Sequence, residues 1–284
     1  MRIIRAAELG MCFGVRDALQ IAAEVADPAL VTIHGELVHN PAVIRQLDEA
    51  GFHQSSENDR TSCPPTPLVL ITAHGVSNRE RDRLQSEGKG VLDTTCPLVR
   101  RVHGAALELA HEKRHVLLIG KPGHVEVRGI VEDLDSFDVV VNAQAVRDYQ
   151  QTRLGVVCQT TMPTEIVDEV LVEIKNRNPT ANIRFVDTVC HPTKRRQQAM
   201  LDLIKLVDAV VVVGGQNSNN TKRLVQLCEK HCTPALHVTN ADEVDPKWIG
   251  NAKTIGLTAG TSTLDETIDE VHARLEQIAS ERRH

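Results

Sequence analysis

The sequence predicts an α/β protein of three related units, each with a mostly parallel sheet. Short runs of valine, leucine and isoleucine alternate with amphipathic segments along the 284-residue chain, which is the pattern of βαβ units. Aromatic residues make up only 2% of the chain, so small aliphatic side chains have to fill the core, as they do around buried parallel strands. A short motif that contains a cysteine occurs twice, which favours repeated units.

The predicted strands are short apolar runs, and the predicted helices carry apolar residues three or four positions apart. We expect strands at residues 30–33, 68–72, 115–120, 137–141, 154–158, 208–214 and 253–258. We expect helices at residues 41–50, 78–87, 97–112, 163–176, 220–231 and 264–279.

Three of the seven cysteines, Cys12, Cys96 and Cys190, follow one another at similar intervals. The segment VLDTTCPLVRR (91–101) resembles FVDTVCHPTKRR (185–196), with Asp, Thr and Cys in step. We interpret each cysteine as the end of a strand and the start of a helix, delivered from the same place in three related units. The alternative is a chance match, because motifs this short are weak evidence.

These intervals also predict the domain boundaries. We expect a first domain at residues 13–96, a second at 97–188 and a third at 189–284, which residues 1–12 complete.

The composition excludes several classes of function. The chain has 32 basic and 38 acidic residues, a net charge of −6, so there is no basic excess to bind nucleic acid. The longest apolar run, residues 209–213, is far too short to span a bilayer, and the N-terminus does not have the pattern of a signal peptide. We therefore expect a cytoplasmic protein without a membrane span. The chain has seven cysteines, and this odd number argues against a disulfide framework.

Small polar loops follow several predicted strands. They are TAHGVS (72–77), KPGHVE (121–126), CQTTMP (158–163), GGQNSNN (214–220) and TAGTS (258–262). Ligands bind at the carboxyl ends of parallel strands, and helix N-termini there suit phosphate. His74 and His124 lie in two of these loops, and His39 precedes a helix that Pro41 can start, so all three histidines are candidates for binding an anion. The alternative is that the Ser, Thr and Asn residues are ordinary helix N-caps.

The spacing of the three cysteines does not match zinc or ferredoxin sites, which use C-x-x-C pairs. It suggests an iron–sulfur cluster in which one iron lacks a thiolate and is open to substrate. Cys158 and Cys63 are expected to be buried as small hydrophobic side chains. Cys228 and Cys232 form a C-x-x-x-C pair, which leaves a separate metal site open as an alternative.

A series of motifs resembles the 4-hydroxy-3-methylbut-2-enyl diphosphate reductase family, also called IspH or LytB. The motifs cover nearly the whole chain: MCFGV (11–15), ELVHNP (36–41), TAHGVS (72–77), DTTCPLV (93–99), GHVEV (123–127), CQTTMP (158–163), VVGGQNSNNTKRL (212–224) and LTAGTS (257–262). The resemblance implies an oxidoreductase with three pseudo-threefold-related α/β domains around one central 4Fe–4S cluster. Its substrate would be an allylic alcohol diphosphate, and its products isopentenyl and dimethylallyl diphosphate, in the last step of the non-mevalonate isoprenoid route. The implied electron donor is ferredoxin or flavodoxin.

The resemblance also implies roles for individual residues. Cys12, Cys96 and Cys190 would bind the cluster, and Glu126 would supply protons so that the substrate hydroxyl leaves as water. The implied substrate-binding residues are His39, His74, His124, Thr160, Ser218, Asn219, Asn220 and Ser262.

The chain departs from the family pattern beside two of these cysteines. His191 and Pro192 follow Cys190, and Met11 and Phe13 flank Cys12. Two other functions stay open on the sequence: a non-catalytic cluster sensor or carrier, and a cluster-dependent lyase or dehydratase that consumes no electrons.

Overall fold

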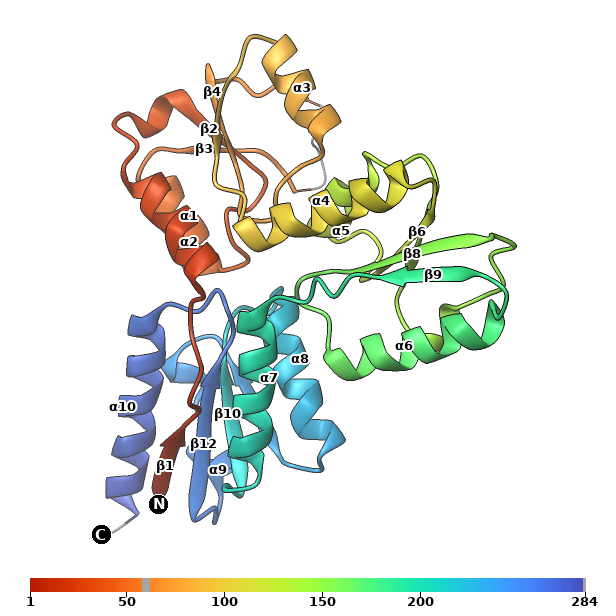
Figure 1. Cartoon of the computed structure of the whole chain (residues 1–284). Coiled ribbons are helices and arrows are strands. Elements are labelled where there is room, and N and C mark those ends of the chain that lie inside the picture. Colours follow the sequence, from red (N-terminus) through yellow and green to blue (C-terminus); the bar gives the residue numbers. More distant parts are fainter. Residues whose placement is uncertain (58–61, 283–284) are drawn as a thin grey trace. The chain divides into compact units, whose positions relative to one another are not determined.

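The computed structural model describes residues 1–57 and 62–282 (Figure 1). The strands are β1 (Arg2–Arg5), β2 (Val31–His34), β3 (His53–Gln54), β4 (Leu68–Ile71), β5 (Gly90–Asp93), β6 (His115–Ile119), β7 (Phe137–Val140), β8 (Arg153–Cys158), β9 (Asn182–Phe185), β10 (Ala209–Val213), β11 (Ala235–Val238) and β12 (Thr254–Ala259). The helices are α1 (Phe13–Ala23), α2 (Pro41–Glu49), α3 (Asn78–Ser86), α4 (Pro97–His111), α5 (Val125–Val131), α6 (Thr164–Arg177), α7 (His191–Ile204), α8 (Asn219–Lys230), α9 (Pro246–Ile249) and α10 (Asp265–Glu281). Short 3-10 turns occur at Pro28–Leu30, Ala143–Ala145 and Ala241–Glu243.

The strands form three parallel four-stranded sheets with the same strand order. The first sheet has the order β3-β2-β4-β5, the second β7-β6-β8-β9 and the third β11-β10-β12-β1. In the first sheet, β2 lies between β3 and β4, and β5 lies at the edge beside β4. The other two sheets repeat this arrangement, with β6 and β10 in the place of β2. β1 takes the fourth place in the third sheet, where Arg2–Arg5 pairs with β12. The predicted class, three α/β domains with parallel sheets, is confirmed.

The chain forms two compact units. Unit 1 consists of Met1–Val15, His39–Val43 and His191–His284, and it contains the third sheet. Unit 2 consists of Arg16–Val38 and Ile44–Cys190, and it contains the first and second sheets. The boundaries predicted for three separate domains stay a prediction.

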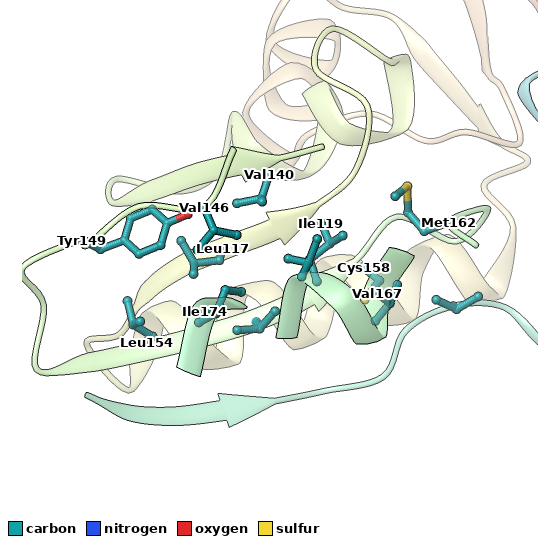
Figure 2. Packing of buried hydrophobic residues seen from close by; sticks show 13 residues of the cluster. Leu117, Ile119, Val140, Val146, Tyr149, Leu154, Cys158, Met162, Val167 and Ile174 are labelled. Carbon is teal, nitrogen blue, oxygen red and sulfur yellow. The ribbon is translucent and has the colours of Figure 1, made fainter. Parts of the chain in front are cut away.

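Helices cover both faces of the second sheet. On one face, Val167 and Ile174 of α6 pack against Leu117 and Ile119 of β6 (Figure 2). Val156 of β8 belongs to the same cluster. On the other face, α4 and α5 pack against the intervening residues of the same strands. Burial on both faces explains why these strands are continuous apolar runs in the sequence.

The third sheet is covered in the same way. Met200 and Leu203 of α7 and Leu224 of α8 pack against Val210 and Val212 on one face. The apolar residues of α9 and α10 pack against the other face.

Every strand and helix predicted from the sequence is present, with ends that differ by at most two residues. The strands missing from the predicted ranges are β1, β3, β5, β9 and β11, although β1, β5 and β9 were implied as the strands that end before Cys12, Cys96 and Cys190. All of them lie at sheet edges, where the residues are partly exposed and the sequence is less apolar. In the part of the chain that the structure describes, no helix combines the length and the apolar character needed to cross a bilayer.

Candidate functional site

Each candidate ligand cysteine follows the fourth strand of its sheet and directly precedes a helix. Cys12 comes between β1 and α1, Cys96 between β5 and α4, and Cys190 between β9 and α7. In all three cases the cysteine N–H donates to the carbonyl two residues beyond the end of the third strand. These bonds are Cys12 to Thr261 (3.2 Å), Cys96 to Ala73 (3.1 Å) and Cys190 to Thr160 (3.0 Å). The prediction that three related units deliver one cysteine each from the same place is confirmed.

The repeated Asp-Thr-x-Cys motif makes the same hydrogen bonds in both copies. The Asp carboxylate accepts the backbone N–H two residues on, and the Thr hydroxyl donates to the carbonyl that ends the neighbouring strand. The pairs are Asp93 with Thr95 (2.9 Å), Asp187 with Val189 (3.2 Å), Thr94 with Ile71 (2.6 Å) and Thr188 with Cys158 (2.6 Å). The two copies of the motif therefore have the same local structure, which supports the interpretation as a repeat.

The polar loops lie where the strand order reverses in each sheet. The five loops follow β4, β6, β8, β10 and β12, and the segment with His39 follows β2. Together these are the first and third strands of each sheet in its series. In open parallel sheets this switch point is where loops on neighbouring strands diverge and leave room for a ligand. All the predicted substrate-binding residues lie in or directly after these loops.

Glu126 is a buried carboxylate with two hydrogen bonds from one residue. It lies in the first turn of α5 and is 2% exposed. Thr160 donates to it twice, from its backbone N–H to Oε1 (2.7 Å) and from its hydroxyl to Oε2 (2.8 Å). Burial raises the pKa of Glu126 to about 7, although the bonds from Thr160 oppose the shift. A carboxyl with this pKa can give up a proton near neutral pH.

His74 and His124 lie close together in unit 2. Their ring centroids are 5.8 Å apart in an edge-to-face arrangement. His124 is also the N-cap of α5, where its Nδ1 accepts the N–H of Glu126 (3.2 Å). The structure thus brings together His74, His124, Glu126 and Thr160, and the carbonyl of Thr160 holds the N–H of Cys190.

The remaining predicted substrate-binding residues lie in unit 1. Ser262 Oγ donates to the carbonyl of His39 (3.2 Å), and Asn220 Oδ1 accepts the N–H of Thr261 (3.0 Å). Ser218 is the N-cap of α8, so the N-cap alternative holds for this residue. Asn219 opens α8. His39 therefore groups with the loops of the third sheet, although it follows β2 of the first sheet in the chain.

Two buried polar residues that position these loops were missed by sequence analysis. Asn40 donates to the carbonyl of Ser262 (2.6 Å) and also caps the start of α2. Gln159 is 1% exposed and accepts the N–H of Lys121 (2.9 Å), which fixes the loop before His124. Both residues lie in motifs already noted in the sequence, ELVHNP for Asn40 and CQTTMP for Gln159, and these motifs were the signal that could have found them.

The other cysteines differ from one another in burial. Cys158 is fully buried in the core of the second sheet, as predicted. The prediction is wrong for Cys63, whose side chain lies at the surface although the neighbouring Pro64 and Thr66 are buried. Cys228 is buried in the third-sheet core, where burial raises its thiol pKa to about 12, whereas Cys232 is exposed. One inert thiol and one surface thiol do not make a metal site.

Over residues 1–57 and 62–282, no three His, Cys, Asp or Glu side chains are grouped closely enough to hold a metal ion. Cys12 belongs to unit 1, and Cys96 and Cys190 belong to unit 2. The three thiols are partly exposed and outside any disulfide, and thiolates are the usual ligands of iron–sulfur clusters. The donor chemistry fits such a cluster, and the cluster stays a prediction.

The fold and the site residues define a class: a parallel α/β protein in which three equivalent sheets each present one cysteine. Residues 3–276 match the family model described as LytB protein. The chain belongs to the LytB family.

Proteins named 4-hydroxy-3-methylbut-2-enyl diphosphate reductase resemble this chain over its whole length. One from Pelobacter propionicus is 35% identical and one from Thermoanaerobacter sp. (strain X514) is 32% identical, with 98% and 99% of this chain and 99% of each relative covered. The solved structure of the Plasmodium falciparum E-1-hydroxy-2-methyl-but-2-enyl-4-diphosphate reductase has a TM-score of 0.88 and 26% identity, and the match covers 96% of this chain and 87% of that one. A second reductase structure, described as the terminal enzyme of the non-mevalonate pathway, has a TM-score of 0.67 and 31% identity and is covered in full.

Proposed function

We propose that this chain reduces (E)-4-hydroxy-3-methylbut-2-enyl diphosphate to isopentenyl and dimethylallyl diphosphate. The reaction takes up two electrons and two protons: the C–O bond breaks, the hydroxyl leaves as water with one proton, and the carbon skeleton takes the other. One observation carries the proposal beyond family membership. A buried carboxyl with a pKa of about 7 is hydrogen-bonded to Thr160, whose carbonyl holds the N–H of a candidate cluster ligand, Cys190.

Cys12, Cys96 and Cys190 would hold one 4Fe–4S cluster. The equivalent backbone bonds of the three residues support this assignment, because they present each thiol from the same place in its sheet. When bound, such a cluster supplies electrons one at a time and offers one iron without a thiolate ligand.

Glu126 would act as the proton donor. Its raised pKa keeps a large share of the carboxyl groups protonated near pH 7, and Thr160 fixes both carboxyl oxygens. Protonation of the hydroxyl turns a poor leaving group into water. Thr160 would orient the carboxyl and contact the same end of the substrate.

The substrate diphosphate would be bound by the polar side chains at the strand ends. These are His39, His74, His124, Ser218, Asn219, Asn220 and Ser262. Imidazoles, hydroxyls and the N–H groups at the starts of α5 and α8 are suitable donors to phosphate oxygens. Their contribution would be to neutralise charge and fix orientation.

The electron donor would be a ferredoxin or a flavodoxin, and the reaction would take place in the cytoplasm. The donor's role can be tested by measuring anaerobic turnover of the allylic diphosphate with a reduced ferredoxin or flavodoxin in place of a reduced dye.

The test is anaerobic turnover of the allylic diphosphate with a reduced dye, comparing the native chain with Glu126→Gln. We expect two electrons to be consumed per product by the native chain, and turnover to fall by two orders of magnitude or more in the variant. A native protein that binds a cluster and turns over nothing would instead indicate a sensor or a carrier. Product formation without electron consumption would indicate a lyase or dehydratase.

A further inference from the structure

The segment that carries Cys12 is attached to helix α7 on both sides of the cysteine. Two residues before Cys12, the carbonyl of Gly10 accepts a hydrogen bond from Nη2 of Arg196. One residue after Cys12, the ring of Phe13 stacks on the ring of His191, with centroids 5.7 Å apart and planes 10° apart. Gly10, Cys12, Phe13, His191 and Arg196 all belong to unit 1.

Arg196 joins this segment to the first turns of α7. Its side chain is buried, with the residue only 3% exposed, and its Nη1 donates to the carbonyl of Pro192 (3.3 Å). One guanidinium therefore bridges Pro192 in α7 and Gly10 in the Cys12 segment. Hydrogen bonds from a charged donor are stronger than neutral ones, and burial keeps water from replacing them.

The other side of Gly10 is fixed by α10. Gly10 has a φ of 76°, and a Cβ at this position would lie 2.9 Å from Ile268 Cδ1 and 3.2 Å from Asp265 Oδ1. The positive φ favours glycine, and a larger residue would push the ends of the Ile268 and Asp265 side chains aside. The Gly10 backbone therefore lies between α10 on one side and Arg196 of α7, which binds its carbonyl.

We propose that Arg196 and the Phe13–His191 stack are positioning residues that set the orientation of the Cys12 thiol. They fix the backbone at Gly10 and Phe13, and the bond from Cys12 N–H to Thr261 fixes the residue between them. Phe13 and His191 are two of the residues at which the chain departs from the family pattern, and the structure shows that they contact each other. The part that concerns the cluster rests on the proposed function, whereas the orientation of Cys12 does not.

The test measures the Cys12 thiol directly in reduced protein without a cluster. We compare the native chain with Phe13→Ala and Arg196→Met, using the alkylation rate at Cys12 by mass spectrometry with the exposed Cys63 as internal reference. Phe13 is 38% exposed, so its removal leaves the core intact, and the equally exposed Phe137 provides a matched control, Phe137→Ala. We expect Cys12 to be alkylated several-fold faster in both variants, at the native rate in the control, and at an intermediate rate in Arg196→Lys.

After cluster reconstitution, the same variants should show a changed EPR spectrum or midpoint potential. Native alkylation rates at Cys12 in a folded Phe13→Ala protein would overturn the proposal, even if Arg196→Met fails to fold. A native chain that binds no iron would overturn the proposed function instead, and the alkylation result would still decide the role of Phe13 and Arg196.

Discussion

At the residue scale, the environment of Glu126 decides what its carboxyl can do. A glutamate in the first turn of a helix is usually exposed and ionised, because the positive end of the helix favours its charge. Here the side chain is 2% exposed, and burial outweighs the two hydrogen bonds from Thr160. Burial therefore leaves Glu126 as a carboxyl with a raised pKa, whereas an exposed glutamate at this helix position would be an ordinary surface charge.

The raised pKa predicts how turnover depends on pH. If protonated Glu126 is the acid, the rate should be constant below about pH 7 and fall above it, since the carboxyl is then ionised. Thr160→Val removes the hydroxyl bond that lowers this pKa, so the falling limb should move to higher pH. Thr239→Val is the matched control, because Thr239 makes the same two bonds to Glu243 at an exposed site. A limb that does not move in Thr160→Val would contradict the assignment.

The same pKa predicts a pH dependence of stability. Between about pH 4.5 and 7 the folded chain binds a proton at Glu126 that the unfolded chain has released, so the free energy of unfolding should fall as pH rises through this window. The shift sets an upper limit of about 3 kcal/mol on this effect. Urea unfolding of Glu126→Gln should show a shallower fall over the same range, and an unchanged slope would argue against the raised pKa.

At the element scale, helix α8 is held by contacts between one buried side chain and two glycines. Thr221 is fully buried, and its Oγ1 would lie 2.4 Å from a Cβ at Gly214 and 2.1 Å from a Cβ at Gly260. These glycines follow β10 and β12, so the helix start lies directly against both strand ends. This close packing places Ser218 and Asn220 beside the loop that carries Ser262.

Gly260→Ala should therefore separate α8 from the strand ends. We expect a loss of about 1–3 kcal/mol in the free energy of unfolding, as is usual for overpacked cores. Gly104→Ala is the matched control, because Gly104 is exposed in α4 and a Cβ there meets nothing within 4 Å. The control should be neutral or stabilising by up to about 1 kcal/mol, since alanine favours helices. Equal effects of both changes in urea unfolding would contradict this packing.

Sequence patterns predicted the elements well where burial is complete. β10 consists of fully or nearly fully buried aliphatic residues, and it was found from its apolar run. β9 and β11 are edge strands with partly exposed residues, and no period in their sequences distinguishes them from loops. Asn40 and Gln159 lie in motifs that the sequence shows, but their partners Ser262 and Lys121 are distant along the chain, so the motifs alone did not reveal which loops they hold.

At the scale of the whole molecule, the first residues of the chain complete a sheet formed by its last third. β1 pairs with β12, and Cys12 follows β1 as Cys96 follows β5 and Cys190 follows β9. The repeated Asp-Thr-x-Cys motif predicted this equivalence for Cys96 and Cys190. It has no counterpart before Cys12, where only the spacing and the resemblance gave a reason, and the shared backbone bond supplies the missing evidence.

Deletion of residues 1–5 should therefore destabilise the third sheet. The deletion removes every ladder bond between β1 and β12 and exposes a new sheet edge. We expect a lower thermal midpoint and more oligomers in light scattering. A midpoint equal to that of the native chain would show that β1 is dispensable for the sheet.

The most direct test of the account is the iron content of anaerobically reconstituted protein. For the native chain we expect about four iron atoms per chain, as in a [4Fe–4S] cluster. Single Ser substitutions of Cys12, Cys96 and Cys190 should each lower the iron content sharply, while Cys232→Ser, which changes an exposed thiol, should retain it. A native chain that binds no iron, or a Cys12, Cys96, Cys190 triple variant that binds as much as the native chain, would contradict the claim that these three cysteines hold one cluster.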